Sequence, residues 1–205
     1  MKKIILLAVV AIMATMSVNG QDAYADMKHE VAVSTGGFST SNALDIYRLV
    51  SDVGQEEGIM YDLRKLRGPY SIEYFYRVKN WLGVGGMFVY GKGNMKASYL
   101  NKPIENTLIE ELRCNYISLM PAVKLDWIRR QYFGMYSKVA LGLTSRYQYV
   151  DYVNTTRGDE ELRATHLNGQ LTLVGMDFGS PHFRGFLDLG FGEQGVLLIG
   201  LRYKF

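Results

Sequence analysis

Apolar and polar residues alternate along eight segments of the chain. In the last segment Leu197, Ile199, Leu201 and Tyr203 occupy one face, and charged or small residues occupy the other. A period of two is that of a β-strand, because successive side chains leave opposite faces of the sheet. The alternation predicts strands at Lys28–Phe38, Tyr70–Lys79, Leu82–Met95, Leu112–Asp126, Tyr132–Tyr147, Arg163–Phe178, Phe183–Phe191 and Gly195–Phe205.

The connections between these segments alternate between long and short, at about 31, 2, 16, 5, 15, 4 and 3 residues. Transmembrane barrels show this alternation because their strands are joined by short periplasmic turns and longer extracellular loops. An even number of strands also returns both termini to the periplasmic side. The expected fold class is therefore all-β, an eight-stranded antiparallel transmembrane up-and-down β-barrel.

The first long loop, Ser39 to Pro69, contains a segment with helical periodicity. Leu44, Tyr47 and Val50 fall on one helical face, and Ser41 stands where it can cap the N-terminus. A short amphipathic helix is predicted within this loop.

The N-terminus has the pattern of a secretory signal peptide. Two lysines precede an apolar run from Ile4 to Met16, which is too short to span a bilayer comfortably as a helix, and small residues lead to Gly20. We expect a signal peptide at 1–20, Sec-dependent export with cleavage, and a barrel domain at 21–205. No later stretch approaches the roughly 20 apolar residues of a membrane helix.

Two features indicate that the apolar face points outward. Small residues such as Ala140, Gly142 and Gly190 share the polar face, as the inside of a narrow tube requires. Aromatic residues gather near the strand ends, where they would form two girdles at the membrane interfaces. A secreted lipocalin-like ligand-binding barrel, with apolar side chains inside, is the alternative that this argument opposes.

With this pattern the chain resembles the small bacterial outer-membrane β-barrel domain proteins of the eight-stranded OmpA and OmpX type. The resemblance covers the whole mature chain in architecture. The ending with Leu201, Tyr203 and Phe205 looks like the terminal assembly signal of that family, which implies location in the outer membrane and recognition by the barrel-assembly machinery. Membership of such a family implies location and fold more firmly than activity.

The polar face predicts a charged barrel interior. Eight strands leave a space that side chains fill, so enclosed charges should pair as a plug rather than line a gated ion or proton path. The expected interior polar network comprises Glu30, Glu73, Arg77, Lys124, Asp126, Lys138, Arg184, Asp188, Arg202 and Lys204.

Charge and histidine placement exclude several function classes. Removal of the two leader lysines from 23 basic residues leaves 21 against 20 acidic ones, so no electrostatic reason favours nucleic acid. His29 and His182 fall at one end of the predicted barrel and His166 at the other, so they form no single metal site. No cofactor is expected.

Three functions remain open. The first is a non-enzymatic outer-membrane protein with a structural or surface-interaction role, contacting lipids and binding a surface ligand through Ser39–Pro69. The second is a lipid hydrolase or acyltransferase of the outer membrane in which His166 works with Ser145 or Glu161. The third is the secreted ligand-binding barrel.

Overall fold

The computed structural model describes residues 27–53, 59–62, 67–99, 108–152 and 160–205. The predicted signal peptide at 1–20 lies outside these ranges, as do parts of the first, second and third long loops. The described elements are β1 (His29–Gly37), α2 (Thr40–Val53), β2 (Ile59–Asp62), β3 (Arg67–Lys79), β4 (Leu82–Tyr99), β5 (Leu108–Arg129), β6 (Phe133–Tyr152), β7 (Glu160–Gly179), β8 (Phe183–Gly192) and β9 (Leu197–Lys204).

Eight of the nine described strands form a closed antiparallel ring. The order around the ring is β1, β3, β4, β5, β6, β7, β8, β9 and back to β1, so every neighbour along the chain is also a neighbour in the barrel once β2 is set aside. The predicted eight-stranded up-and-down barrel is confirmed. The short β2 adds to the free end of β4, where Ile59 lies opposite Tyr99.

The first and last strands close the ring. Glu30 lies opposite Lys204, and Gly37 lies opposite Leu197. At the end of this seam His29 and Phe205 exchange two backbone hydrogen bonds of 2.9 Å each. Closure of this kind gives the backbone polar groups partners without water, which a structure inside lipid requires.

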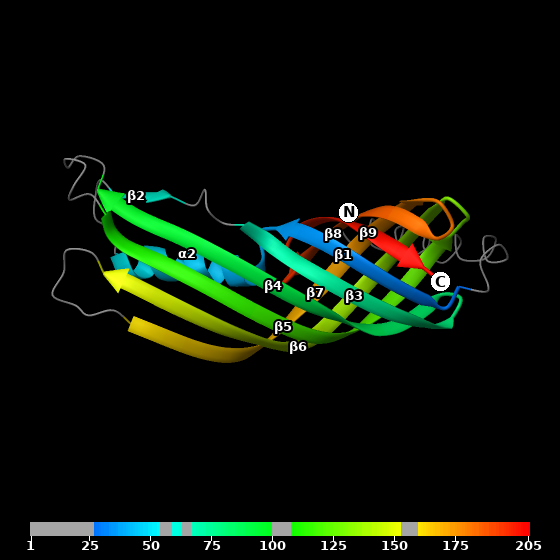
Figure 1. Cartoon of the computed structure of the whole chain (residues 1–205), viewed down its shortest axis with the longest axis horizontal. Coiled ribbons are helices and arrows are strands. Elements are labelled where there is room, and N and C mark those ends of the chain that lie inside the picture. The colour runs from blue at the N-terminus through cyan, green and yellow to red at the C-terminus, as the bar shows by residue number, and fades with distance from the viewer. Residues whose placement is uncertain (1–26, 54–58, 63–66, 100–107, 153–159) are drawn as a thin grey trace, which may run out of the picture.

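The two ends of the barrel differ. The short connections that follow β3, β5 and β7 lie at one end together with the start of β1 and the end of β9 (Figure 1, right), and we call it the turn end. The opposite end carries α2, β2 and the strand ends that the longer connections join (Figure 1, left), and we call it the loop end. The alternation of loop lengths predicted this arrangement.

Strands β4, β5, β6 and β7, with 18 to 22 residues each, extend well beyond the others at the loop end (Figure 1). Strand β5 has 22 residues, whereas β9 has 8. At about 3.3 Å per residue and a tilt near 45°, 22 residues still rise about 50 Å, twice the apolar band of about 25 Å in a membrane barrel. We call this part of β4–β7 the outer extension. The predicted strands were too short here because residues near Leu108 and Glu160 lack apolar alternation.

The predicted helix is present as the fourteen-residue α2. The prediction that Ser41 caps it is wrong: the Ser39 hydroxyl accepts a 3.2 Å hydrogen bond from the Asn42 N–H, and Ser41 points into the barrel mouth. The chain turns sharply at Phe38, whose φ is 64°, so the helix begins earlier than the apolar spacing suggested. Among the described residues no helix is long and apolar enough to cross a membrane.

The apolar face of the wall points outward, as predicted. Leu119 and Leu141 are 67% and 63% exposed, whereas Lys138 is 1% exposed. A patch of apolar side chains also lies inside, next to the charges, and includes Phe75 and Met87. An exposed apolar wall around a buried polar centre is the reverse of a soluble barrel, and this observation argues against the lipocalin-like alternative.

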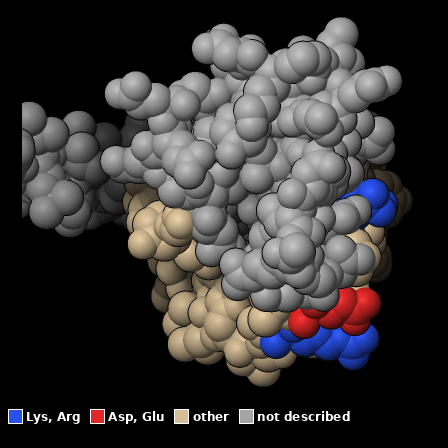
Figure 2. All heavy atoms as spheres, turned by 90° about the vertical axis from the view of Figure 1, so that its left-hand side faces the viewer, with Lys and Arg blue, Asp and Glu red and all other residues tan. Residues whose placement is uncertain are grey.

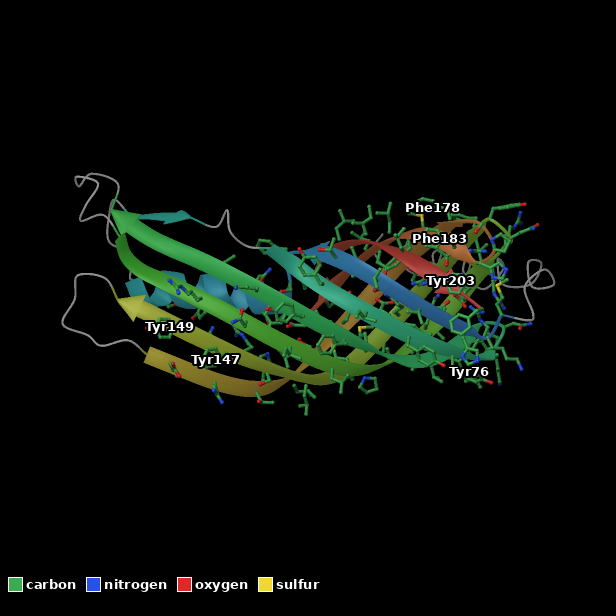
Figure 3. All side chains as sticks on the ribbon, viewed as in Figure 1. Tyr76, Tyr147, Tyr149, Phe178, Phe183 and Tyr203 are labelled. Carbon is green, nitrogen blue, oxygen red and sulfur yellow. The ribbon has the colours of Figure 1, made fainter. Side chains whose placement is uncertain are left out.

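Aromatic side chains gather at both ends of this wall. Tyr76, Phe178, Phe183 and Tyr203 lie together toward the turn end (Figure 3). Tyr147 and Tyr149 lie on the outer extension at the other end (Figure 3). Their positions are those of the two predicted interfacial girdles.

Candidate functional site in the barrel interior and mouth

The structure places all ten predicted interior charges inside the barrel. Nine are at most 9% exposed as whole residues, and the side chain of Asp126 is 6% exposed. They come from β1, β3, β5, β6, β8 and β9. Side chains from opposite walls therefore meet across the lumen.

One group of ion pairs lies toward the turn end and joins β1, β3 and β5. Glu30 accepts a 2.6 Å hydrogen bond from the Lys124 ammonium, and Arg77 donates to Asp126 at 3.0 Å. Arg77 also approaches Glu30 at 3.7 Å. The group spans three strands of the barrel and fixes their inward side chains relative to one another.

Asp177 on β7 holds three cations at once. Its carboxylate lies 2.6 Å from Arg184, 3.0 Å from Arg202 and 2.8 Å from Lys204. Asp177 is 1% exposed and was not among the predicted interior residues. It was missed because a bulge between Thr172 and Val174 reverses which residues of β7 face inward.

Tyr136 and Lys138 organise the middle of the lumen. Lys138 lies 2.6 Å from Glu73 and 2.8 Å from Asp188. The Tyr136 hydroxyl donates to Asp188 at 2.6 Å and accepts from Arg202 at 3.0 Å. The Arg202 guanidinium also lies 4.5 Å from the Tyr136 ring centre, a cation–π distance.

The turn between β8 and β9 folds into the mouth of the barrel, where Glu193 and Gln194 are fully buried. Gln194 donates to Glu73 at 2.7 Å and thereby joins the mouth to the ion pairs below. Gly195 allows the inward fold because its φ is 110° and a Cβ there would lie 2.4 Å from the Gly37 carbonyl oxygen. Sequence reasoning missed this inward fold because it interpreted the segment as a simple connection.

Glu193 connects the turn to α2 and to the wall. Its carboxylate accepts hydrogen bonds from Ser41 at 2.7 Å, from Ser118 at 3.2 Å and from Asn168. The hydroxyl of Ser39 lies 2.8 Å from that of Tyr116, so the first turn of α2 is held at a second point. The described start of the predicted ligand-binding loop is thus docked in the mouth.

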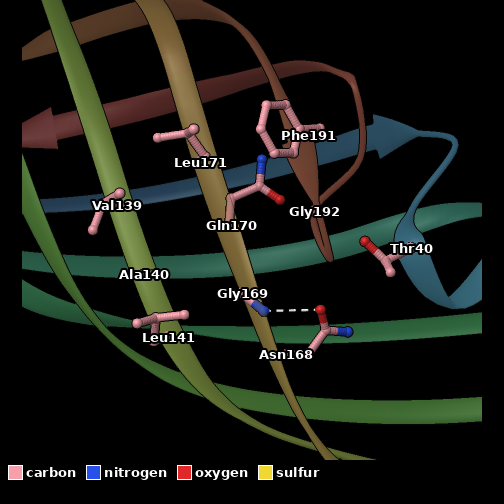
Figure 4. A pocket seen from close by; sticks show the side chains of 10 residues that line it. All are labelled: Thr40, Val139, Ala140, Leu141, Asn168, Gly169, Gln170, Leu171, Phe191 and Gly192. Carbon is pink, nitrogen blue, oxygen red and sulfur yellow. Dashed lines mark hydrogen bonds between the residues drawn. The ribbon is translucent and has the colours of Figure 1, made fainter.

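A hollow of about 360 Å³ indents the wall where β8 turns inward (Figure 4). Leu141, Leu171 and Phe191 line its outer part. Deeper in the hollow, Asn168 accepts a 2.8 Å hydrogen bond from the Gly169 N–H (Figure 4). The hollow faces the apolar surface and brings together no group of acid, base and nucleophile.

The residues of the predicted hydrolase do not meet. Ser145 and Glu161 are exposed on the outer face of the wall. His166 instead belongs to the inward-facing set of β7 residues. Side chains on opposite faces of one sheet cannot work on one substrate atom. His29 and His182 lie at the turn end, as predicted. Nowhere in the described part of the chain do three or more metal-binding side chains converge.

Comparison with solved structures finds bacterial outer-membrane barrels. The crystal structure of Ail, the attachment invasion locus protein of Yersinia pestis, is 13% identical with a TM-score of 0.47 and covers 87% of this chain and 97% of Ail. The N-terminal β-barrel domain of Pseudomonas aeruginosa OprF is 12% identical with a TM-score of 0.40, covering 88% and 100%. The outer membrane protein OprG of the same species is 12% identical with a TM-score of 0.41, covering 87% and 94%.

No family model matches the chain, and no curated protein matches it. The solved structures are of the class that the sequence pattern predicted, and at these identities the likeness concerns the fold alone.

Proposed function

We propose that this chain is a non-enzymatic integral protein of the outer membrane, with a closed interior and an outer extension that binds an extended segment of a partner at the cell surface. The turn end then faces the periplasm and the loop end faces outward. The observation that carries the proposal is the unpaired edge of β7.

The contacts in the barrel interior support the proposal that the interior is closed. Lys138 and Arg202 lie in the middle of the lumen and are each 1% exposed. Ion pairs and the Tyr136 ring bridge the walls there, and Glu193 and Gln194 fill the mouth above. A narrow barrel filled in this way favours a closed interior over a path for solutes.

The outer extension presents one covered edge and one open edge. β2 pairs with the free end of β4. On the other side β7 pairs with β8 only from Gln170 to Gly179, so residues 160–169 have β6 as their only strand partner among the described residues. Unpaired N–H and C=O groups along a strand edge are a template for an added strand.

The direction of these backbone groups can be assigned. The Gly169 carbonyl accepts a hydrogen bond from the Glu193 N–H, so it points to the open side of β7. Because backbone groups alternate along a strand, the N–H groups of Thr165 and Arg163 point the same way. A partner strand would bond to these groups.

Thr165→Pro tests the edge. It removes one N–H that points to the open side of β7, and it leaves the backbone hydrogen bonds to β6 in place. We expect peptides selected from a random display library against the purified barrel to bind the natural chain and to lose binding by tenfold or more with Thr165→Pro. The matched control Thr165→Val keeps the N–H and should bind normally. Selected peptides that bind Thr165→Pro as well as the natural chain would refute the edge as the binding site.

Recognition by the assembly machinery gives a separate prediction for Phe205. Phe205 is half exposed, and the centre of its ring lies 5.4 Å from the centre of the His29 ring. Phe205→Asp should sharply reduce folded barrel in the outer membrane without blocking export, and Phe205→Tyr should not. Membrane fractionation and the gel shift between unheated and boiled samples measure this. A normal yield of folded Phe205→Asp barrel would contradict the assigned signal.

A further inference from the structure

On the outer face of β4–β7, the band of apolar side chains ends at a defined row of residues. One row of side chains across the four strands is entirely apolar and is 40% to 73% exposed: Phe88, Leu119, Leu143 and Leu167. The next outward-facing row toward the loop end is Tyr90, Ile117, Ser145 and Thr165. The change from an entirely apolar row to one that contains a tyrosine and two hydroxyl side chains marks the membrane interface.

Cations stand directly above this level. The following row is Lys92, Asn115, Tyr147 and Arg163, and Arg113 lies one outward-facing position beyond Asn115. The cations Lys92, Arg113 and Arg163 are exposed. With strands about 4.8 Å apart, the row is about 14 Å wide. We call Lys92, Arg113, Asn115, Tyr147 and Arg163 the cationic patch.

The patch contains a hollow of about 320 Å³. Six of the residues that line it are Tyr90, Asn115, Ile117, Ser145, Tyr147 and Arg163. The Arg163 guanidinium lies 5.1 Å from the Tyr147 ring centre, which holds it beside the hollow. The side-chain oxygen of Asn115 is buried without a hydrogen-bond partner among the described residues, and half a turn of the amide would present its N–H groups instead.

The patch is confined to one side of the barrel. At the corresponding end of β8, β9 and β1, the outward residues are Phe191, Leu197 and Thr35. Seen from the loop end, basic and acidic side chains lie together along one side of the rim, and the opposite lower side shows neither (Figure 2). The one described acidic group beside Tyr147 is Glu161, which accepts a hydrogen bond from that phenol and raises its pKa.

We propose that the cationic patch binds the phosphate of an outer-leaflet lipid, whose acyl chains lie against the apolar row below. Arg163 and Lys92 supply the charge, the Asn115 amide supplies hydrogen-bond donors, and the hollow receives the phosphate. The assignment to the outer leaflet rests on the orientation given under the proposed function. The binding chemistry does not depend on the β7 edge.

The test uses the full mature protein in a neutral maltoside detergent and counts bound lipid by native mass spectrometry during titration with diacyl phosphatidic acid. Lys92→Gln with Arg163→Gln should weaken retention roughly 25-fold, because each cation near such a surface contributes about a factor of five. The charge-matched control is Lys28→Gln with Lys79→Gln, two exposed lysines at the turn end. Glu161→Gln should strengthen retention, which a folding defect would not do.

Four outcomes together support the site: loss in the patch variant, normal retention in the turn-end control, a gain in Glu161→Gln, and weak binding of diacylglycerol. Equal retention by the patch variant and the natural chain would overturn it, as would an equal loss in the turn-end control. Full competition by millimolar inorganic phosphate would also overturn it, because it would indicate a site for the free anion. Thr165→Pro should retain lipid normally. This result would show that lipid binding by the cationic patch does not depend on the β7 edge.

Discussion

Asp177→Asn should lower the free energy of unfolding by about 3–5 kcal/mol, the cost of leaving a buried charge without its partner. Within the described part of the chain, Lys204 forms its ion pair with Asp177, at 2.8 Å, whereas Arg184 keeps hydrogen bonds to three backbone carbonyls. In Asp177→Asn, Lys204 is therefore left as a buried cation without a carboxylate partner. Urea unfolding of the barrel in lipid vesicles, followed by tryptophan fluorescence, measures the change.

A second substitution identifies the cause. Lys204→Met added to Asp177→Asn should recover a large part of the lost stability, because it removes the unpaired cation. Glu161→Gln, at an exposed carboxylate, should change stability by less than about 0.5 kcal/mol. A loss in Asp177→Asn no larger than that of Glu161→Gln would show that the interior ion pairs do not hold the barrel together.

The membrane-embedded part of the fold could be predicted because lipid and a narrow lumen act on alternate residues of one strand. On β6, Lys138 and Leu141 obey that alternation, and the structure places them on opposite faces. The C-terminal strand could be read in the same way, from Leu197 to Tyr203. The interior charges followed from the same rule, since a charged side chain cannot face lipid without a large cost.

The rest of the site could not be predicted because it depends on irregular backbone. A bulge reverses the faces of β7 before Asp177, although an acidic residue between Met176 and Phe178 was a usable signal of that reversal. Glu193 reaches the mouth through a turn that needs glycine at positive φ. The outer extension has polar residues on both faces, so no period of two reveals its strands.

Leu141→Arg should cost about 2–4 kcal/mol in a bilayer, because the side chain lies within the apolar stretch of β6 and is 63% exposed on its outer face. Ser145→Arg is the matched control on the same strand and the same face, at the interface level, where the cost falls to about 0–1 kcal/mol. Unfolding free energies of both variants in lipid vesicles give the comparison. Equal costs at the two positions would mean that β6 does not cross the membrane at the depth assigned here.

The most direct test of the inverted barrel compares neighbouring positions on β6 as single cysteines, Ala140→Cys and Leu141→Cys, in a Cys114→Ser background. Ala140 is 2% exposed and faces the lumen, whereas Leu141 faces outward. In bilayers, a thiol reagent dissolved in the lipid should label position 141 and leave position 140 unlabelled, while a membrane-impermeant reagent in water should label neither. Labelling of position 140 from the lipid, or of position 141 from water alone, would contradict an apolar wall around a polar interior.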